Sequence, residues 1–316
     1  MNLPVGECRQ ELATDHFFAT GEFVHVQTQI AQVVRSIKIN WIVVVWMIAI
    51  HIGALLALLP FSFSWSGLAL CVLLHWLTGG IGICLCYHRL LTHRSFRLVK
   101  PLEYLFTFFG DLAAQGGAFE WVGKHRIHHK FSDEPGDPHS PKDGHWWSHM
   151  LWVFTRDEND GPSMWKRYVP DLVRDPIHRV LHHLSSLSPL FLAGGLYLLG
   201  YLISGHLLAF SWLVWGVFVR MILVYHCTWF VNWASHVWGY RTYETGDESR
   251  NLWWVALVSY GEGWHNNHHA YQRSAAHGMR WWEFDMTYWT IRLLGLLRLA
   301  RDIRLPVRVK AEASTQ

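Results

Sequence analysis

Histidines in three dense clusters are the residues of this chain best suited to chemistry. The clusters read His88-Arg-Leu-Leu-Thr-His93, His125-Arg-Ile-His128-His129 and His265-Asn-Asn-His268-His269. Imidazole is the commonest metal ligand in proteins, and its neutral form near pH 7 suits iron, zinc or copper. A lone histidine is more often a structural residue, but eight histidines in three tight clusters predict a metal centre.

The spacing within each cluster indicates how the rings are presented. In both H-x-x-H-H clusters the first histidine precedes the others by three and four residues, which places all three on one face of an α-helix. His88 and His93 are five residues apart, so we expect a helix end or a distortion between them. Asn232 and His236 share a helix face at i, i+4 and add a ninth imidazole, with Asn232 acting through water or on a ligand.

The composition indicates a membrane protein. The chain has 316 residues, of which 51% are hydrophobic and 16% charged, against about 25% charged in soluble domains. A net charge of +3 without a basic-aromatic motif excludes nucleic acid as an expected partner. The five cysteines include no C-x-x-C pair, and four lie in apolar runs, which favours buried thiols in a reducing compartment.

Hydrophobic runs predict four transmembrane helices in two hairpins, at residues 39–63 and 66–87 and at residues 187–203 and 207–231, because roughly 20 apolar residues cross a bilayer. The short gap inside each hairpin holds no Lys or Arg, whereas basic residues flank the other ends. The positive-inside rule therefore places both termini in the cytoplasm. The apolar stretch 102–119 is interrupted by Asp111 and Gln115, which favours a re-entrant or interfacial helix over a fifth span.

This topology places every histidine cluster on one side of the membrane. The expected fold is therefore all-α, with a cytoplasmic helical cap that holds the metal site next to the membrane. We expect a cytoplasmic N-terminal segment 1–38, a membrane domain 39–310 whose cap comprises residues 88–186 and 232–310, and a tail 311–316. If the protein is bacterial, the membrane is the inner (plasma) membrane.

These motifs resemble those of the membrane fatty-acyl desaturases. The order H-R-L-L-T-H-R-S-F, H-R-I-H-H-K-F-S-D and H-N-N-H-H, together with the hydrophobic hairpins, is similar to the Δ9 branch, which includes bacterial acyl-lipid desaturases and animal stearoyl-CoA desaturases. The resemblance extends from about Ile39 to Trp289 and includes Asp133-Glu-Pro-Gly-Asp-Pro-His139, Trp146-Trp-Ser-His149, Gly261-Glu-Gly-Trp-His265 and His277-Gly278.

The resemblance implies two iron ions (Fe²⁺) and the insertion of a cis double bond in unsaturated fatty acid biosynthesis. The implied imidazole ligands are His88, His93, His125, His128, His129, His236, His265, His268 and His269. Asn232 matches a position that contacts one metal through water. An unactivated methylene has no acidic proton and no leaving group, so such a reaction needs a metal oxidant, O₂ and two external electrons, and releases two waters.

The resemblance also bears on the substrate and the electron donor. Between Trp121 and His125 the chain reads Val-Gly-Lys, where animal acyl-CoA enzymes have an Arg-Asp pair that touches the CoA headgroup. An acyl-lipid substrate is therefore at least as well supported as acyl-CoA, although Lys124 could itself meet a phosphate. The chain has no haem domain, Rossmann fingerprint or iron–sulfur cysteine set, so a ferredoxin or a flavin-linked reductase is the expected donor.

An acyl tunnel is predicted along the second span. Steps of four back from His88 give Cys84, Gly80 and Trp76, where Gly80 leaves room for an alkyl chain and Trp76 closes the far end. Close helix packing explains Gly79 and Gly80 equally well, but the matching positions in the family line the tunnel. The resemblance also implies that the bend beside the metals is formed by Gln115, Trp121, Thr228 and Trp229.

Two other functions remain open on the sequence alone. A hydroxylase or related monooxygenase on the same di-iron platform differs only in the step after hydrogen abstraction. A metal transporter or a haem-carrying electron-transfer protein would need ligands within the spans, where His51 and His75 are isolated.

Overall fold

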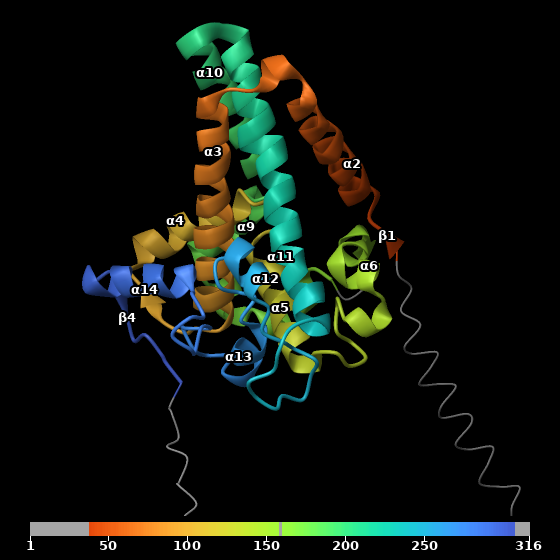
Figure 1. The fold of residues 1–316 in the computed structure, drawn as a ribbon, viewed down its shortest axis with the longest axis vertical. Helices are drawn as coiled ribbons and strands as arrows, with labels where there is room; N and C mark the ends of the chain where they lie inside the picture. The colour runs from red at the N-terminus through yellow and green to blue at the C-terminus, as the bar shows by residue number, and fades with distance from the viewer. Residues whose placement is uncertain (1–37, 158–159, 307–316) are drawn as a thin grey trace, which may run out of the picture.

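The protein is mostly helical, and long apolar helices form an elongated stalk (Figure 1). The computed structural model describes residues 38–157 and 160–306, so most of the predicted segment 1–38 and the tail 311–316 lie outside the described residues. The stalk consists of α2 (Trp41–Leu55), η1 (Leu56–Leu58), η2 (Pro60–Ser62), α3 (Trp65–His75), η3 (Trp76–Thr92), α10 (Ser188–Leu213), η6 (Val214–Val219) and α11 (Arg220–Val237).

Shorter elements gather at one end of the stalk (Figure 1). They are α4 (Lys100–Asp111), α5 (Ala118–Phe131), η4 (Pro141–Asp143), α6 (His145–His149), η5 (Leu151–Phe154), α7 (Pro162–Tyr168), α8 (Pro170–Arg174), α9 (Pro176–Leu184), α12 (Trp253–Val258), α13 (His265–Ala270) and α14 (Met286–Leu296). Two antiparallel pairs of two-residue strands join distant segments: β1 (Lys38–Ile39) with β3 (Thr155–Arg156), and β2 (Arg97–Leu98) with β4 (Ala300–Arg301). These strand pairs were not expected from the sequence.

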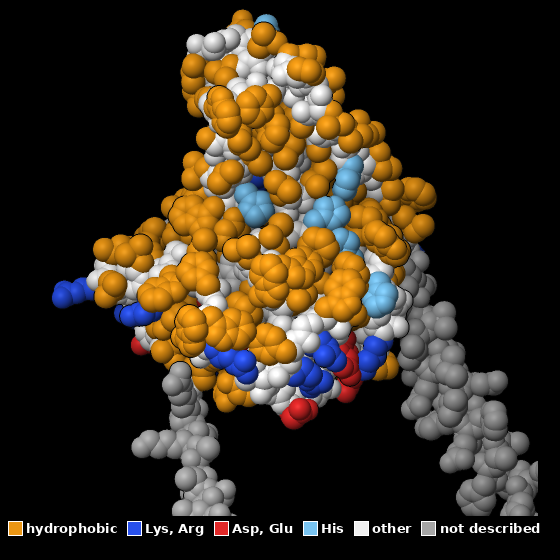
Figure 2. All heavy atoms as spheres, viewed as in Figure 1, with side chains coloured by type: hydrophobic (Ala, Val, Ile, Leu, Met, Phe, Trp, Pro, Cys, Tyr) orange, Lys and Arg blue, Asp and Glu red, His pale blue; other side chains and the backbone are white. Residues whose placement is uncertain are grey.

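Three helical segments are long and apolar enough to cross a membrane: Trp41–Leu58, Trp65–Thr92 and Ser188–Val237. Hydrophobic side chains cover most of the visible surface of the stalk in Figure 2. Lys and Arg side chains gather at the end of the molecule where the shorter helices lie (Figure 2). In α2 only Met47, Ile50 and Gly53 are buried, as expected for a helix that contacts lipid on most of its circumference. Side-chain oxygens of Asn40 and Ser64 accept backbone hydrogen bonds at the start of α2 and α3.

The third segment turns back on itself at Ser204 and Gly205, at the top of Figure 1. Gly205 has φ +76°, a left-handed conformation that glycine adopts without strain. A Cβ atom on Gly200 would lie 2.8 Å from Cα of Ala209, so the two arms touch immediately beside the turn. The predicted spans 187–203 and 207–231 correspond to these two arms.

Helix η3 is a π-helix, and this explains the spacing of the first histidine cluster. Hydrogen bonds in a π-helix join residues five apart, so such residues lie nearly above one another. The amide of His93 donates to the carbonyl of His88 at 3.2 Å, which closes the last turn. The expected distortion is therefore present as a change of helical period.

Glycines and a buried arginine hold α4 against the stalk. A Cβ atom on Gly82 of η3 would lie 2.4 Å from the amide nitrogen of Gly110, so only glycine permits this approach. Arg220 of α11 is fully buried and donates to the carbonyls of Leu112 at 2.8 Å and Gly216 at 3.2 Å. These contacts fix the end of α4 and the turn that carries Gln115. The apolar stretch 102–119 thus contains a helix that packs on η3 and ends at Asp111.

Candidate metal centre and adjoining cavity

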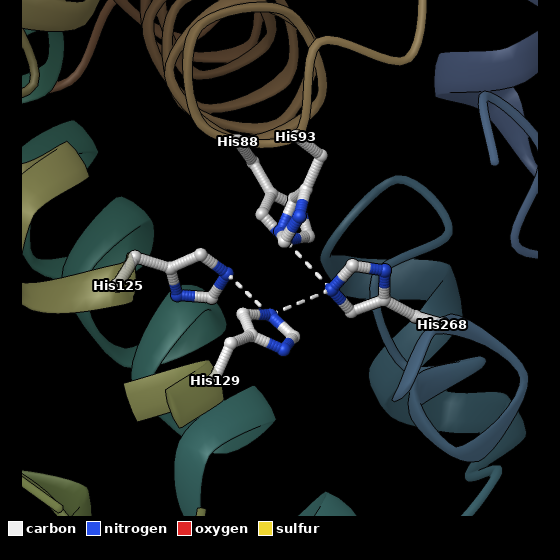
Figure 3. A group of neighbouring side chains, drawn as sticks. All are labelled: His88, His93, His125, His129 and His268. Atoms are coloured by element: carbon white, nitrogen blue, oxygen red, sulfur yellow. Dashed lines mark hydrogen bonds between the residues drawn. The ribbon is translucent and has the colours of Figure 1, made fainter. Parts of the chain in front are cut away.

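Five of the nine predicted histidines converge on one point (Figure 3). Helix η3 and its C-cap provide His88 and His93, α5 provides His125 and His129, and α13 provides His268. The Nε2 atom of His268 lies 3.1 Å from Nε2 of His88 and 3.0 Å from Nε2 of His129. Nε2 of His129 lies 3.1 Å from Nε2 of His125. We call these residues the five-histidine cluster.

The other four predicted ligands form a second group beside it. His128 of α5, His236 of α11, and His265 and His269 of α13 are all buried and each offers one nitrogen within 4.8 Å of the others. Nε2 of His265 lies 3.0 Å from Nε2 of His236. The rings of His129 and His269 link the two groups, with centroids 4.6 Å apart. We call this group the four-histidine cluster.

The donor set fits metal ions. Two imidazole nitrogens that bind one ion at about 2.1 Å lie about 3 Å apart when they are neighbouring ligands. The Nε2 atoms of His93, His128 and His269 are buried without a hydrogen-bond partner, an arrangement that is costly unless a ligand satisfies them. Burial, reinforced by neighbouring imidazoles, lowers the pKa of His93, His125, His129, His265 and His268 well below 6.5 and keeps them in the neutral form that binds metals.

Carboxylates contact Nδ1 of four of the rings; Asp133, Asp137 and Glu262 are buried, and Asp247 is partly exposed. Nδ1 of His128 donates to Asp137 at 3.0 Å, Nδ1 of His236 to Asp133 at 2.8 Å, and Nδ1 of His269 to Asp247 at 2.5 Å. Nδ1 of His88 contacts Glu262 at 2.7 Å. Such partners fix the tautomer and leave Nε2 free to bind a metal ion. None of these carboxylates is predicted to have a role from the sequence alone.

Glu262 is shared by three groups. Besides His88, its carboxylate contacts the fully buried Arg89 at 3.0 Å and Nδ1 of His277 at 3.0 Å. Burial opposes ionisation, but Arg89 and the two imidazoles hold the pKa of Glu262 well below 4.5. Arg89 also donates to Asp285 at 2.8 Å, so the network links η3 to the segment before α14. His277 stacks on His268 with centroids 4.3 Å apart.

A cavity of about 310 Å³ adjoins both clusters. His88 and His125 of the five-histidine cluster and His265 of the four-histidine cluster line it, as does Asn232, which lies one turn before His236 on α11. The position of Asn232 at the cavity is compatible with a contact to a metal ion through water, and this contact stays a prediction.

The four residues predicted at the tunnel bend are brought together here. Gln115, Trp121, Thr228 and Trp229 all line the cavity. The amide of Gln115 donates to Thr228 Oγ1 at 2.8 Å, and Nε1 of Trp121 donates to Gln115 Oε1 at 3.3 Å. Trp121 also stacks on His125 at 5.0 Å. The network thus joins α5 and α11 at the cavity wall next to His125 of the five-histidine cluster.

The predicted far end of the tunnel is not part of this cavity. Cys84 lines it, but Trp76 and Gly80 do not. A Cβ atom on Gly80 would lie 3.0 Å from Trp76 and 3.3 Å from the ring of Tyr260, so the space beside Gly80 is filled by these two side chains. Trp76 also borders a shallow outer hollow with α3. The tunnel role of both residues stays a prediction.

Charged residues line another part of the cavity wall. They include Glu120, Lys124, Arg156 and Asp160, and Nζ of Lys124 lies 3.2 Å from Asp160. The ammonium considered for phosphate contact is therefore already paired with a carboxylate. Helix α2 contributes Val43, Trp46 and Met47 to the same cavity, so its lining is shared between the stalk and the short helices.

Comparison with known proteins shows which family the chain belongs to. The fatty acid desaturase family matches residues 63–296. The chain is 48% identical to the sn-1 stearoyl-lipid 9-desaturase of Anabaena variabilis, over 85% of this chain and 95% of that protein. It is 48% identical to the sn-2 palmitoyl-lipid 9-desaturase of Nostoc sp. (strain 36), over 85% and 92%.

A relative with another named substrate is an acyl-CoA 5-desaturase of Anemone leveillei. It is 39% identical over 98% of this chain and 94% of that protein. The family match covers most of the chain, and the cyanobacterial relatives are aligned over nearly their full length. This chain belongs to the fatty acid desaturase family.

Proposed function

We propose that the protein is an O₂-dependent acyl-lipid desaturase that introduces a cis double bond at the Δ9 position of a saturated chain. The observation that carries the proposal is the pair of histidine clusters whose ring nitrogens converge beside a cavity with a polar wall. The names of the cyanobacterial relatives support the acyl-lipid substrate and the Δ9 position.

The five-histidine cluster would hold one iron ion and the four-histidine cluster the other. When bound, the two irons supply the oxidising power, with O₂, that an unactivated C–H bond requires. The protein's own contribution is to exclude water and to bind and bend the acyl chain in the adjoining cavity, which we call the acyl cavity. Gln115, Thr228 and Trp121 would hold the chain at one curvature, since their hydrogen bonds lock the wall beside His125.

The overall reaction balances with an external donor. The acyl chain loses two hydrogen atoms, which carry two electrons and two protons. Two further electrons from a donor protein and two protons from water complete the reduction of O₂ to two molecules of water. A ferredoxin or a flavin-linked reductase is the proposed donor.

Two features favour an acyl-lipid over acyl-CoA as the substrate. The Lys124 ammonium is paired with Asp160 and is thereby less available to a CoA phosphate. Stalk residues Val43, Trp46 and Met47 also line the cavity, so a chain esterified to a membrane lipid could approach from the bilayer side.

For the topology we propose four spans in two hairpins. The two arms on either side of Ser204–Gly205 would cross separately, which adds one crossing to the three apolar segments. Both termini and the cap would then lie in the cytoplasm, as the basic residues at the helix ends favour. In a bacterium the protein would reside in the inner membrane.

Expression in a host that lacks Δ9 monoenes tests the proposal. Membrane lipids would be separated by class, and double-bond positions in each would be assigned by gas chromatography–mass spectrometry. We expect Δ9 monoenes that appear in intact lipids without passing through the CoA pool. An oxygenated acyl chain would identify a hydroxylase instead, and an unchanged lipid profile beside normal membrane insertion would refute oxidation of acyl chains.

A further inference from the structure

A second, basic hollow reaches the five-histidine cluster through ligands that do not line the acyl cavity. It has a volume of about 520 Å³, and the ligands His93 and His129 are among its lining residues. The acyl cavity is lined by two other members of the cluster, His88 and His125. Different ligands of one cluster thus border the two spaces, so a molecule in the hollow can approach the metal ligands while the cavity holds an acyl chain.

The charges that line the hollow are all positive. They belong to Arg94, Arg126, Lys130 and Arg273, and among the described residues no Asp or Glu lines it. Arg94 and Arg126 share the carboxylate of Asp171, at 2.6 Å and 2.8 Å. Lys130 and Arg273 are exposed and form no ion pair with any described residue. The hollow therefore carries a surplus of positive charge beside two histidines of the proposed metal centre.

The position of the hollow favours a protein partner in water. Thr92 and His93 mark the end of η3, where the apolar segment Trp65–Thr92 ends. Lys and Arg side chains gather at this end of the molecule, away from the turn of α10 (Figure 2). An open, positive surface next to histidines of the proposed metal centre suits an acidic partner, because complementary charge steers encounter and sets the docking orientation.

We propose that this hollow is the docking surface for an acidic one-electron carrier protein. The proposal rests on the proposed desaturase function, which requires two external electrons for each double bond. Each reduced carrier is oxidised by one electron, so two carriers dock in succession per turnover. Carboxylates of the carrier would lie against Lys130 and Arg273, and its cofactor would approach His93 and His129.

A charge-reversal experiment tests the docking surface. The Lys130→Glu/Arg273→Glu variant would be compared with Lys166→Glu/Arg301→Glu, which changes the charge equally at exposed positions that do not line the hollow. The probe is an acidic [2Fe–2S] ferredoxin, and its affinity for each purified protein would be measured at low and high salt. We expect the hollow variant to bind at least about tenfold more weakly at low salt, whereas the control binds like the wild type.

A second measurement separates docking from catalysis. Enzyme reduced with dithionite and supplied with substrate lipid and O₂ should form the same single-turnover amount of monoene in the hollow variant as in the wild type. With reduced ferredoxin as the donor, the hollow variant alone should be slow. If the wild type forms no monoene with dithionite, the desaturase function fails, while the binding measurement still decides the docking surface.

Unchanged ferredoxin affinity in the hollow variant would overturn the docking proposal. If that variant also binds more weakly to vesicles that contain phosphatidylglycerol, Lys130 and Arg273 are assigned to contact with anionic lipid instead. Iron content would be measured in every variant, so that loss of metal is not mistaken for loss of docking.

Discussion

The two histidine clusters differ in how many of their rings contact a carboxylate. In the four-histidine cluster three rings, those of His128, His236 and His269, donate through Nδ1 to carboxylates. In the five-histidine cluster only His88 contacts a carboxylate among the described residues. A carboxylate behind an imidazole raises its basicity and fixes its direction. If both clusters bind iron as proposed, most ligands of the smaller cluster would be held by carboxylates, and the larger cluster would rely on a greater number of ligands.

The clusters also differ in their access to solvent. All four members of the four-histidine cluster are buried, whereas His93 and His129 of the five-histidine cluster line the basic hollow. The acyl cavity borders both clusters through His88, His125 and His265. We therefore expect electrons to enter at the five-histidine cluster, whereas both clusters face the substrate.

The largest expected effect is the loss of one ligand from either cluster. His128→Ala and His268→Ala should each abolish desaturation, because one site then lacks a ligand and the reaction needs both irons. The chain should still insert, since the apolar helices do not depend on these rings. Lipid analysis, iron content and the amount of protein in the membrane fraction measure the three parts of this prediction.

His183→Ala is the matched control, because this histidine is exposed on α9 and belongs to neither cluster. Its activity should remain near that of the wild type. Near wild-type desaturation by either cluster variant, with a normal membrane fraction, would show that the clusters do not form a shared di-iron site.

Removing the carboxylates tests how much each cluster depends on the carboxylate partners of its histidines. Asp137→Asn and Asp247→Asn should each reduce iron affinity or activity by about 10–100-fold, as is usual for partners behind metal-bound histidines. Glu262→Gln should in addition lower the melting temperature, because the fully buried Arg89 would keep only Asp285 as a charged partner. Iron titration and thermal unfolding separate the effects. Equal loss of thermal stability in all three variants would contradict this distinction.

The sequence predicts the nine histidines of both clusters but not their division into five and four. Ligand type and helical spacing are local properties, so His125, His128 and His129 could be assigned to one helix face. Which ring joins which cluster depends on how α5, α11 and α13 pack, and this is a tertiary property. His128 and His129 are neighbours in the chain yet belong to different clusters.

The carboxylates show where a sequence signal exists and where it fails. Asp133 and Asp137 follow the second histidine motif closely and belong to a segment that matches the family, so a role for them could have been suspected. Asp247 lies in a segment without a histidine motif and reaches His269 only through the fold. The π-helix is an intermediate case, because the five-residue spacing of His88 and His93 indicated a distortion but not its type.

A smaller effect is expected for Asn232, which faces the cavity rather than completing a cluster. Asn232→Ala should reduce the turnover rate by about tenfold and leave iron content unchanged, because a contact through water tunes the metal without holding it. Steady-state kinetics and iron analysis of the same preparation measure both quantities. Loss of one iron per chain would instead make Asn232 a ligand of the four-histidine cluster.

Substitutions beside the predicted tunnel end should change which chain is used more than how fast it reacts. Gly80→Leu should shorten the accepted acyl chain and Trp76→Ala should lengthen it, while the double bond keeps its distance from the carboxyl end. The side chains of Trp76 and Tyr260 already meet at Gly80, so a leucine there would need them to move. Fatty acid profiles from cells fed chains of different length provide the measurement. Unchanged profiles at normal expression would leave helix packing as the role of Gly80.

The smallest expected effect concerns an ion pair that anchors α5, the helix that supplies both clusters. Arg126, between His125 and His128, donates to both oxygens of Asp171 at 2.8 Å and 3.0 Å and to the carbonyl of Leu91 at 2.6 Å.

Partial burial opposes ionisation, but hydrogen bonds from Arg126 and Arg94 hold the pKa of Asp171 at about 2, below 3.8. A lowered carboxyl pKa stabilises the fold above pH 4 and loses this contribution as the pH falls toward 2. The shift corresponds to at most about 2–3 kcal/mol, and partial exposure reduces this contribution. Asp171→Asn should therefore lower the melting temperature at pH 7, and the difference from the wild type should shrink between pH 4 and pH 2. Because the other acidic groups titrate in both proteins, this difference isolates Asp171. A difference that stays constant with pH would mean that Asp171 acts through packing rather than through its charge.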